Sequence, residues 1–201
     1  MTVGDAYSLS VKEPSIWAPK IPQGVPSDLQ HELATIRRVL VDTQPDTAGI
    51  LSVAVNEQIK HGQNALTQWL RNTNQPIPDE LIKLIGTGEG LTPAGDDYLS
   101  GVIITLHYLK RKAAADTLGQ WVTEHAPGRT NDISLALLLA SCTGNAIEPV
   151  HKLLCEVLTS NINASIEKLT QTVIAIGHNS GCYIIQGILH TLEHANPRLL
   201  H

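Results

Sequence analysis

Apolar residues recur every three or four positions along most of the chain beyond residue 27, which is the spacing of amphipathic helices. Ser27–Gln30 has the form of a capping box, in which a serine and a glutamine satisfy the free N–H groups at a helix start. Short proline- and glycine-containing segments separate the apolar stretches. The stretches are 29–40, 46–60, 65–70, 79–85, 99–109, 113–125, 133–142, 147–157, 166–176 and 184–192.

About eight helices joined by short loops predict an all-α protein, with a single-domain bundle over residues 27–201. Ile133–Cys142 is apolar nearly all round, which predicts a buried helix at the centre of that bundle. Gly62 is expected to bend or divide the second helix, and Gly119 to interrupt the helix at 113–125 weakly.

Residues 1–26 have a different character. They contain Pro14, Pro19, Pro22 and Pro26 and show no helical period. This pattern predicts an extended proline-rich arm, in which Tyr7–Val11 forms a short strand.

Composition narrows the classes of function. The chain has 201 residues, a formal net charge of −5 and scattered basic residues, which argues against nucleic acid as a partner. Its three cysteines lie far apart without a CxxC pair, so free thiols are expected in place of a disulfide framework or a zinc knuckle. No apolar run is long enough for a signal peptide or a membrane span, which predicts a cytoplasmic protein that contacts no membrane. His190 and His194 stand four apart on one helix face but are read as solvated.

The first candidate for chemistry is the turn Gly86–Asp97, where four glycines fall within ten residues between two helices. Glycines allow backbone N–H groups to crowd around an anion, and the following helix adds its own free N–H groups and positive dipole end. Thr92 is placed to cap that helix and Pro93 suits its first position. The turn is not a Walker A loop, because no Gly-Lys-Ser/Thr ends it. The candidate ligand-binding residues of this turn are Gly86, Gly88, Gly90, Thr92 and Gly95.

Asp96 and Asp97 follow in the first turns of the helix. Two carboxylates beside an anion-binding loop indicate a divalent cation such as Mg²⁺, or a catalytic role. The alternative reading is an interhelical turn whose aspartates stabilise the helix dipole without a metal.

The second candidate is the turn Ile176–Gly181. Gly177 ends one helix, and Asn179 or Ser180 is placed to cap the next. His178 adds an imidazole suited to acid, base or anion-binding roles, although an exposed histidine in a plain capping turn fits as well. Asn179, Ser180 and Gly181 are the ligand-binding candidates here.

A third helix start follows Arg129, where Thr130 or Asn131 is placed to cap the helix at 133–142. Thr130 and Ser134 complete the set of candidate ligand-binding residues. If the three helix starts converge, their free N–H groups form a concentrated anion site.

The first turn, followed by Leu99 and Gly101, resembles the signature GxGxGLTPxGDDxLxG of a bacterial family that includes the AllH-type subunit of oxamate carbamoyltransferase, formerly a domain of unknown function. Ile176–Gly181 is similar to that family's IGHSSG, with Asn179 in place of a serine. Thr130, Asp132, Ile133 and Ser134 match a weaker pattern. The resemblance runs from about Trp17 to the end. Because members are typically longer at the N-terminus, it implies a short form lacking most of that region.

The resemblance implies a transferase that exchanges oxalurate and phosphate with oxamate and carbamoyl phosphate, within a complex of several different subunits. Phosphate, carbamoyl phosphate and oxamate are all anions, in keeping with anion-binding turns. It also implies that other protein subunits are partners. Two alternatives stay open: a non-catalytic binding or assembly subunit of a multi-protein complex, and a metal-dependent hydrolase using the acidic pair.

Overall fold

The computed structural model describes residues 2–3, 7–8, 18–19, 21–43, 53–159 and 165–195. Within these residues the chain forms eight α-helices, one 3₁₀ helix and two two-residue strands, which confirms the predicted all-α class. The antiparallel strands are β1 (Thr2–Val3) and β2 (Tyr7–Ser8), and the 3₁₀ helix η2 spans Asp79–Lys83. The helices are α1 (Gln30–Thr43), α2 (Val53–Arg71), α3 (Ala94–Tyr108), α4 (Lys112–His125), α5 (Asp132–Cys142), α6 (Glu148–Thr159), α7 (Ser165–Ile174) and α8 (Ser180–Ala195).

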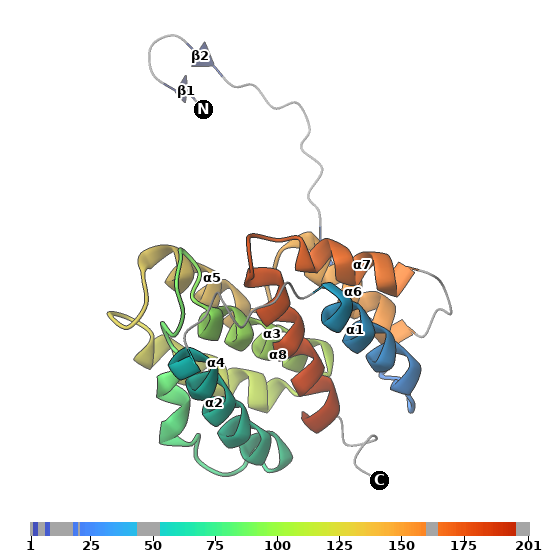
Figure 1. Cartoon of the computed structure of the whole chain (residues 1–201), viewed down its shortest axis with the longest axis horizontal. Helices are drawn as coiled ribbons and strands as arrows, with labels where there is room; N and C mark the ends of the chain where they lie inside the picture. Colours follow the sequence, from blue (N-terminus) through green and yellow to red (C-terminus); the bar gives the residue numbers. More distant parts are fainter. Residues whose placement is uncertain are drawn as a thin grey trace.

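The centre of the molecule is the pair α3 and α8, with α1, α6 and α7 on one side and α2, α4 and α5 on the other (Figure 1). Thirteen of the 15 residues of α3 are buried. The two helices approach closely because Gly101 and Gly187 face each other's backbone. A Cβ added to Gly101 would overlap the carbonyl oxygen of Ile184, and one added to Gly187 would overlap that of Tyr98.

Helix α5 is not the central helix that its composition predicts. Only Ser134, Leu138 and Ser141 are buried in it, while Ile133 and Leu137 are 53% and 47% exposed. It lies at the edge of the bundle and packs on α3 and α4. Leu135 and Cys142 are half-buried against the core, and α3 takes the central place.

The prediction that Gly62 divides the second helix is also wrong. Helix α2 runs without a break from Val53 to Arg71, and the predicted residues 46–52 lie outside the described part of the chain. Gly62 is a contact point, because an added Cβ would overlap the side chain of Leu84. Gly119 likewise lies within an unbroken α4, against Cys142. Both glycines make room for a neighbouring element.

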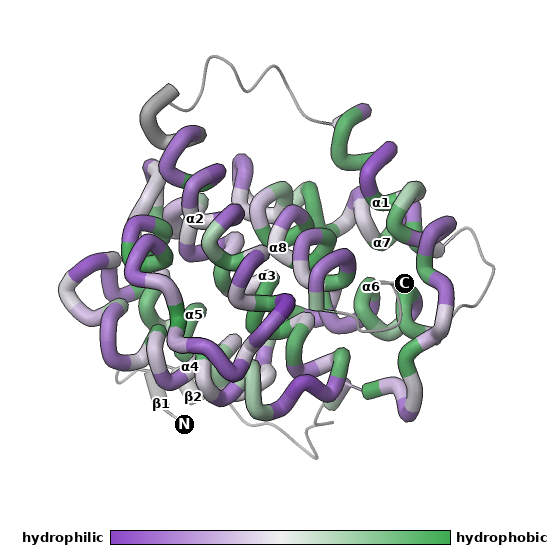
Figure 2. Tube along the Cα trace, turned by 90° about the horizontal axis from the view of Figure 1, so that it is seen from below, coloured by the Kyte–Doolittle hydropathy of each residue, from purple (hydrophilic) through white to green (hydrophobic). Residues whose placement is uncertain are grey.

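The predictions for the N-terminal part of the chain are confirmed only in part. Helix α1 is capped by Asp28, whose Oδ1 accepts the Gln30 N–H at 2.9 Å, and not by the predicted Ser27. β2 falls inside the predicted strand at Tyr7–Val11, but most of residues 1–26 lies outside the described part. Helix α1 carries both hydrophobic and hydrophilic residues along its length, as expected for a helix with one apolar and one polar face (Figure 2). No helix among the described residues is long and apolar enough to cross a membrane.

Candidate functional site

The first glycine turn connects η2 to α3. Gly86, Gly88 and Gly90 all adopt positive φ angles, of 72°, 118° and 95°, where other residues are strained. Gly86 also lies against the backbone of Arg129, because an added Cβ would overlap the Arg129 carbonyl oxygen. The turn is thus shaped by backbone conformation and by close packing on the segment that leads into α5.

Asp96 holds this turn to the start of α5. Its Oδ1 accepts the Gly86 N–H at 2.8 Å, and its Oδ2 accepts the hydroxyls of Thr130 at 2.5 Å and Ser134 at 2.6 Å. The side chain is 1% exposed. Three hydrogen bonds satisfy a buried carboxylate that would otherwise be costly. Asp96 therefore positions the site, and its oxygens point away from the cavities described below.

The amides of the first turn divide into two groups. The Thr87 N–H donates to the Leu84 carbonyl at 3.1 Å, and the Gly95 N–H donates to the Thr87 carbonyl at 2.8 Å. With Gly86 bound to Asp96, the inner half of the turn is saturated by the protein itself. At the outer tip, Glu89–Leu91 are exposed, and their amides make no hydrogen bond to another described residue. This exposed tip presents N–H groups to a ligand.

The two glycine turns meet, so two of the three helix starts considered in the sequence analysis converge. The hydroxyls of Thr92 and Ser180 lie 2.7 Å apart in a hydrogen bond across the junction. A cavity of about 430 Å³ opens on one side of this pair, and we call it the polar cavity because polar side chains such as Asp97, His178 and Asn179 line it. Its wall combines the tip of the first turn with the second turn. The lining residues include Gly90, Leu91, Asp97, His178, Asn179 and Tyr183.

Asp97 is the ionisable group at the junction. It is 6% exposed, and its Oδ2 has no hydrogen-bond partner among the described residues. Burial raises the pKa of this carboxyl from 3.8 to about 6, an effect increased by the neighbouring Asp96 and reduced by the hydroxyls of Ser180 and Thr92. The side chain lines the polar cavity on one side and a second pocket on the other.

This second pocket, of about 440 Å³, lies between α3, α5, α6 and α8 and is mainly apolar. Its branched side chains come from segments far apart in sequence: Ile104, Leu137, Ile147, Val150, Ile176 and Ile184. Helical periodicity identifies these residues as apolar but does not show that four helices leave a space between them. The sequence analysis therefore missed this pocket, and no local motif signals it.

A family model described as oxamate carbamoyltransferase subunit AllH matches residues 84–192. The matched span covers more than half of the 201 residues. The chain belongs to the AllH family. No solved structure matches it. The matched region contains both glycine turns and the start of α5, and it is shorter than the resemblance from about Trp17, because residues 17–83 lie outside it.

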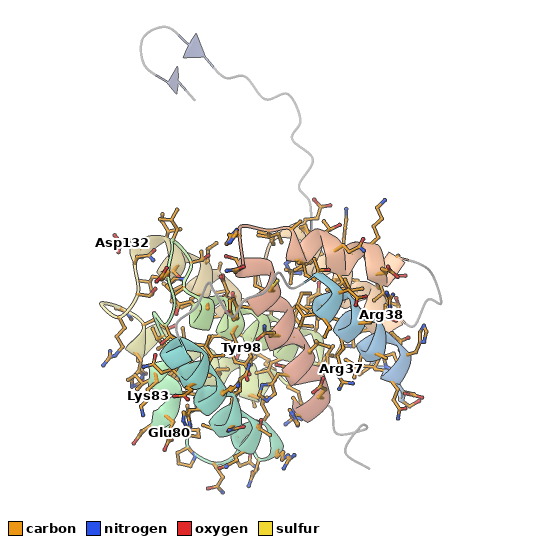
Figure 3. All side chains as sticks on the ribbon, in the orientation of Figure 1. Arg37, Arg38, Glu80, Lys83, Tyr98 and Asp132 are labelled. Atoms are coloured by element: carbon orange, nitrogen blue, oxygen red, sulfur yellow. The ribbon has the colours of Figure 1, made fainter. Side chains whose placement is uncertain are left out.

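Within the AllH region, the third helix start does not join the cavities. Asn131 caps α5, accepting the N–H groups of Ile133 and Ser134 at 3.1 and 3.0 Å. Thr130 and Ser134 bind Asp96 and line neither cavity. Figure 3 places Asp132 at the outer edge of the molecule, well away from Tyr98 at its centre. The first two starts thus form the polar cavity, while the third supports the first turn through Asp96.

His190 is not the solvated residue that the sequence indicates. Its Nε2 is 2.7 Å from the Thr67 hydroxyl, and its Nδ1 is hydrogen-bonded to the Tyr98 hydroxyl. Burial, with a smaller effect of His194, lowers the pKa of His190 to about 4. Across the described residues, no group of three or more His, Cys, Asp or Glu side chains is placed to hold a metal.

Proposed function

We propose that this chain is the substrate-binding subunit of an oxamate carbamoyltransferase and holds a small anionic substrate in the polar cavity between the two glycine turns. The observation that carries the proposal is the meeting of these turns at the Thr92–Ser180 hydrogen bond. Membership of the AllH family supplies the reaction. The cavity of about 430 Å³ has the size of small-molecule sites.

The two ends of the cavity suit a substrate with two kinds of group. The free amides of the Glu89–Leu91 tip, with His178 and Asn179 opposite, provide donors for a phosphate or carboxylate. Asp97 provides an acceptor that repels an anion and favours an N–H donor. Oxamate and carbamoyl phosphate each carry an anionic group and an –NH₂ group, so we orient the –NH₂ toward Asp97.

In the proposed reaction, a phosphate oxygen attacks the carbamoyl carbon of oxalurate. A C–O bond forms, the C–N bond to the oxamate nitrogen breaks, and that nitrogen gains a proton. His178 faces the cavity as the proton donor, and the amides of the tip stabilise the phosphate. Since both oxygens of Asp96 already accept hydrogen bonds, Asp97 with the hydroxyls of Thr92 and Ser180 is the set that would bind Mg²⁺ if the reaction requires it.

The test is calorimetry on the full chain with phosphate, carbamoyl phosphate and oxamate, each with and without Mg²⁺. We expect saturable binding of carbamoyl phosphate and oxamate, and a loss of about tenfold in affinity for His178→Ala, which removes a donor from the cavity. His61→Ala replaces an exposed histidine of α2 outside the cavity and is the matched control. Absence of saturable heat with all three anions would overturn the proposal.

Two further variants separate binding from folding. Asp96→Asn weakens three hydrogen bonds that fix the first turn, so it should lower the melting temperature as well as the affinity. Asp97→Asn keeps the shape of the wall and should change ligand preference in a protein that still folds. If Asp96→Asn changed affinity with no loss of stability, the positioning role assigned to Asp96 would be wrong.

A role in assembly is a second function favoured by α5. This helix exposes Ile133 and Leu137, and Ile147 beyond its end is 41% exposed. Exposed apolar residues in a cluster are typical of protein interfaces. The chain would then contribute a docking surface to the multi-subunit enzyme, alongside or in place of a catalytic role. Leu137→Glu would release it from the co-expressed complex while leaving anion binding by the isolated chain unchanged.

A further inference from the structure

The apolar pocket beside the polar cavity has a chemical character of its own. Six branched aliphatic side chains line it, and Thr92 and Ser180 lie at the end nearest the polar cavity. Asp97 is the sole ionisable residue among those that line it, and Ser100, Ser141 and Asn145 add further polar groups. The pocket of about 440 Å³ thus joins a mainly apolar wall to a carboxylate beside the hydroxyls of Thr92 and Ser180.

The carboxylate has no cationic partner. None of the ion pairs formed by described residues includes Asp97, and its buried Oδ2 accepts no hydrogen bond from them. A buried charge without a partner is costly, and a cation placed beside it recovers much of that cost. Since Asp96 on the neighbouring position is already satisfied by three donors, the unmet demand belongs to Asp97 alone.

We propose that the apolar pocket binds an alkylammonium group, with its –NH₃⁺ against Asp97, Thr92 and Ser180 and its alkyl chain against Ile104, Ile147 and Ile184. An ammonium has three donors and no acceptor, which matches a cluster of three oxygen-bearing side chains. Its alkyl chain gains from leaving water for an apolar wall. This inference concerns the side of Asp97 away from the anion cavity and does not require an anion there. The ammonium would take the place of Mg²⁺ at Asp97, Thr92 and Ser180, so the two cations are alternative occupants of these oxygens.

Two sources could supply such a group: a free aliphatic amine, or a lysine side chain of another subunit. Lysine combines an apolar stem with an ammonium head. The mouth of the pocket includes Leu137 and Ile147, both substantially exposed, so a polypeptide has apolar surface on which to rest. The chemistry at Asp97 is the same in both cases, and the experiment distinguishes them.

The experiment follows the binding of n-hexylamine to the full-length ¹⁵N-labelled chain by NMR at neutral pH. 1-Hexanol, with the same alkyl chain but no charge, and methylamine, with the charge but no chain, are the comparison probes. We expect saturable shifts at the amides around 140–147 and 176–180. 1-Hexanol should bind at least about tenfold more weakly, because a charged donor facing a carboxylate is worth more than a neutral one. Methylamine should also bind at least about tenfold more weakly, because it has no alkyl chain to bury against the apolar wall. Nα-acetyl-lysine methylamide then tests the source: affinity equal to that of hexylamine indicates a polypeptide lysine, and much weaker affinity a free amine.

Variants locate the site. Asp97→Asn should abolish the preference for the amine over the alcohol. Ala140→Phe fills the pocket from α5 and should remove binding of hexylamine, whereas Ala136→Phe adds the same ring one turn away on the exposed face and should not. Equal affinity of wild type for hexylamine and hexanol would overturn the proposal, as would shifts that persist in Ala140→Phe. The comparison of probes on wild type needs no variant to fold, and failure of anion binding in calorimetry leaves its result unaffected.

Discussion

Asp96 and Asp97 are adjacent and chemically identical, yet the fold gives them opposite surroundings. Consecutive helix residues point about 100° apart. One carboxylate therefore meets Gly86, Thr130 and Ser134, and the other meets the junction of two cavities. The sequence placed both at a helix start beside a glycine turn. It could not tell which one would be satisfied, because Thr130 and Ser134 lie 34 and 38 positions further along the chain.

The raised pKa of Asp97 predicts a pH-dependent stability. Its pKa is about 6 in the folded chain against 3.8 when exposed. Between these values the folded state binds more protons than the unfolded state, so the contribution of Asp97 to stability is greatest at low pH and falls as pH rises through about 6. Asn cannot ionise. From about pH 4 to about pH 7, the stability of Asp97→Asn relative to wild type should therefore rise by up to about 3 kcal/mol.

Urea unfolding at a series of pH values measures this difference. The control is Thr143→Ser, which changes an exposed residue that does not ionise, just beyond the end of α5. Its stability relative to wild type should stay nearly constant over the same range. A difference between Asp97→Asn and wild type that does not change with pH would contradict the environment described for Asp97.

At the scale of elements, the crossing of α3 and α8 is the most extensive contact between two helices among the described residues. Glycine in a helix interior is unfavourable by propensity, so Gly101→Ala and Gly187→Ala should each stabilise an isolated helix by about 1 kcal/mol. In the folded chain the added methyl group meets a carbonyl oxygen of the other helix. We expect the steric effect to prevail and each variant to lose about 3 kcal/mol or more, or cooperative folding altogether.

Chemical denaturation followed by circular dichroism tests the crossing. Gly24→Ala is the matched control, because an added Cβ at Gly24 has no neighbour within 4 Å. It should leave stability within about 0.5 kcal/mol of wild type. Stabilisation by either Ala at the crossing would show that the two helices can separate at no cost, contrary to the packing observed.

The spacing of apolar residues predicted some features of the elements correctly and others wrongly. It predicted the helices because each helix must bury an apolar face, and that face is encoded within the helix's own sequence. It misplaced α5 because an all-round apolar helix is expected to be buried, whereas α5 exposes Ile133 and Leu137. Gly62 was also misread, because the reason for a glycine at this position lies 22 positions away in the sequence. The side chain of Leu84 leaves no space for a Cβ at Gly62, and backbone flexibility is not the reason.

At the scale of the whole molecule, both cavities arise from the assembly of helices and from no single segment. The two glycine turns, recognised as motifs in the sequence, predicted part of the wall of the polar cavity, because Thr92 and Ser180 belong to them. The apolar pocket needs side chains from α3, α5, α6 and α8 together. No pattern along the chain encodes that arrangement, because it depends on how the helices pack.

The same arrangement predicts an order of local stability. Opening α3 exposes nearly its whole surface, because 13 of its 15 residues are buried and it contacts α4, α5 and α8. Its amides should therefore exchange with solvent only when the whole molecule unfolds. Helix α5 buries three residues, so opening it costs fewer contacts. We expect native-state hydrogen exchange to be fastest in α5 and slowest in α3 and α8.

A ligand sharpens this test, because the apolar pocket takes part of its wall from α5 through Leu137, Ala140 and Ser141. An occupant of the pocket must be released before α5 can open, so hexylamine should slow exchange in α5 more than in α3, whose exchange already follows global unfolding. Equal exchange rates in α5 and α3 without ligand would contradict the peripheral place of α5. If α5 opens first, its exposed apolar surface and the wall of the pocket open together as one local unit. A ligand or a partner subunit that covers this unit should then slow its hydrogen exchange.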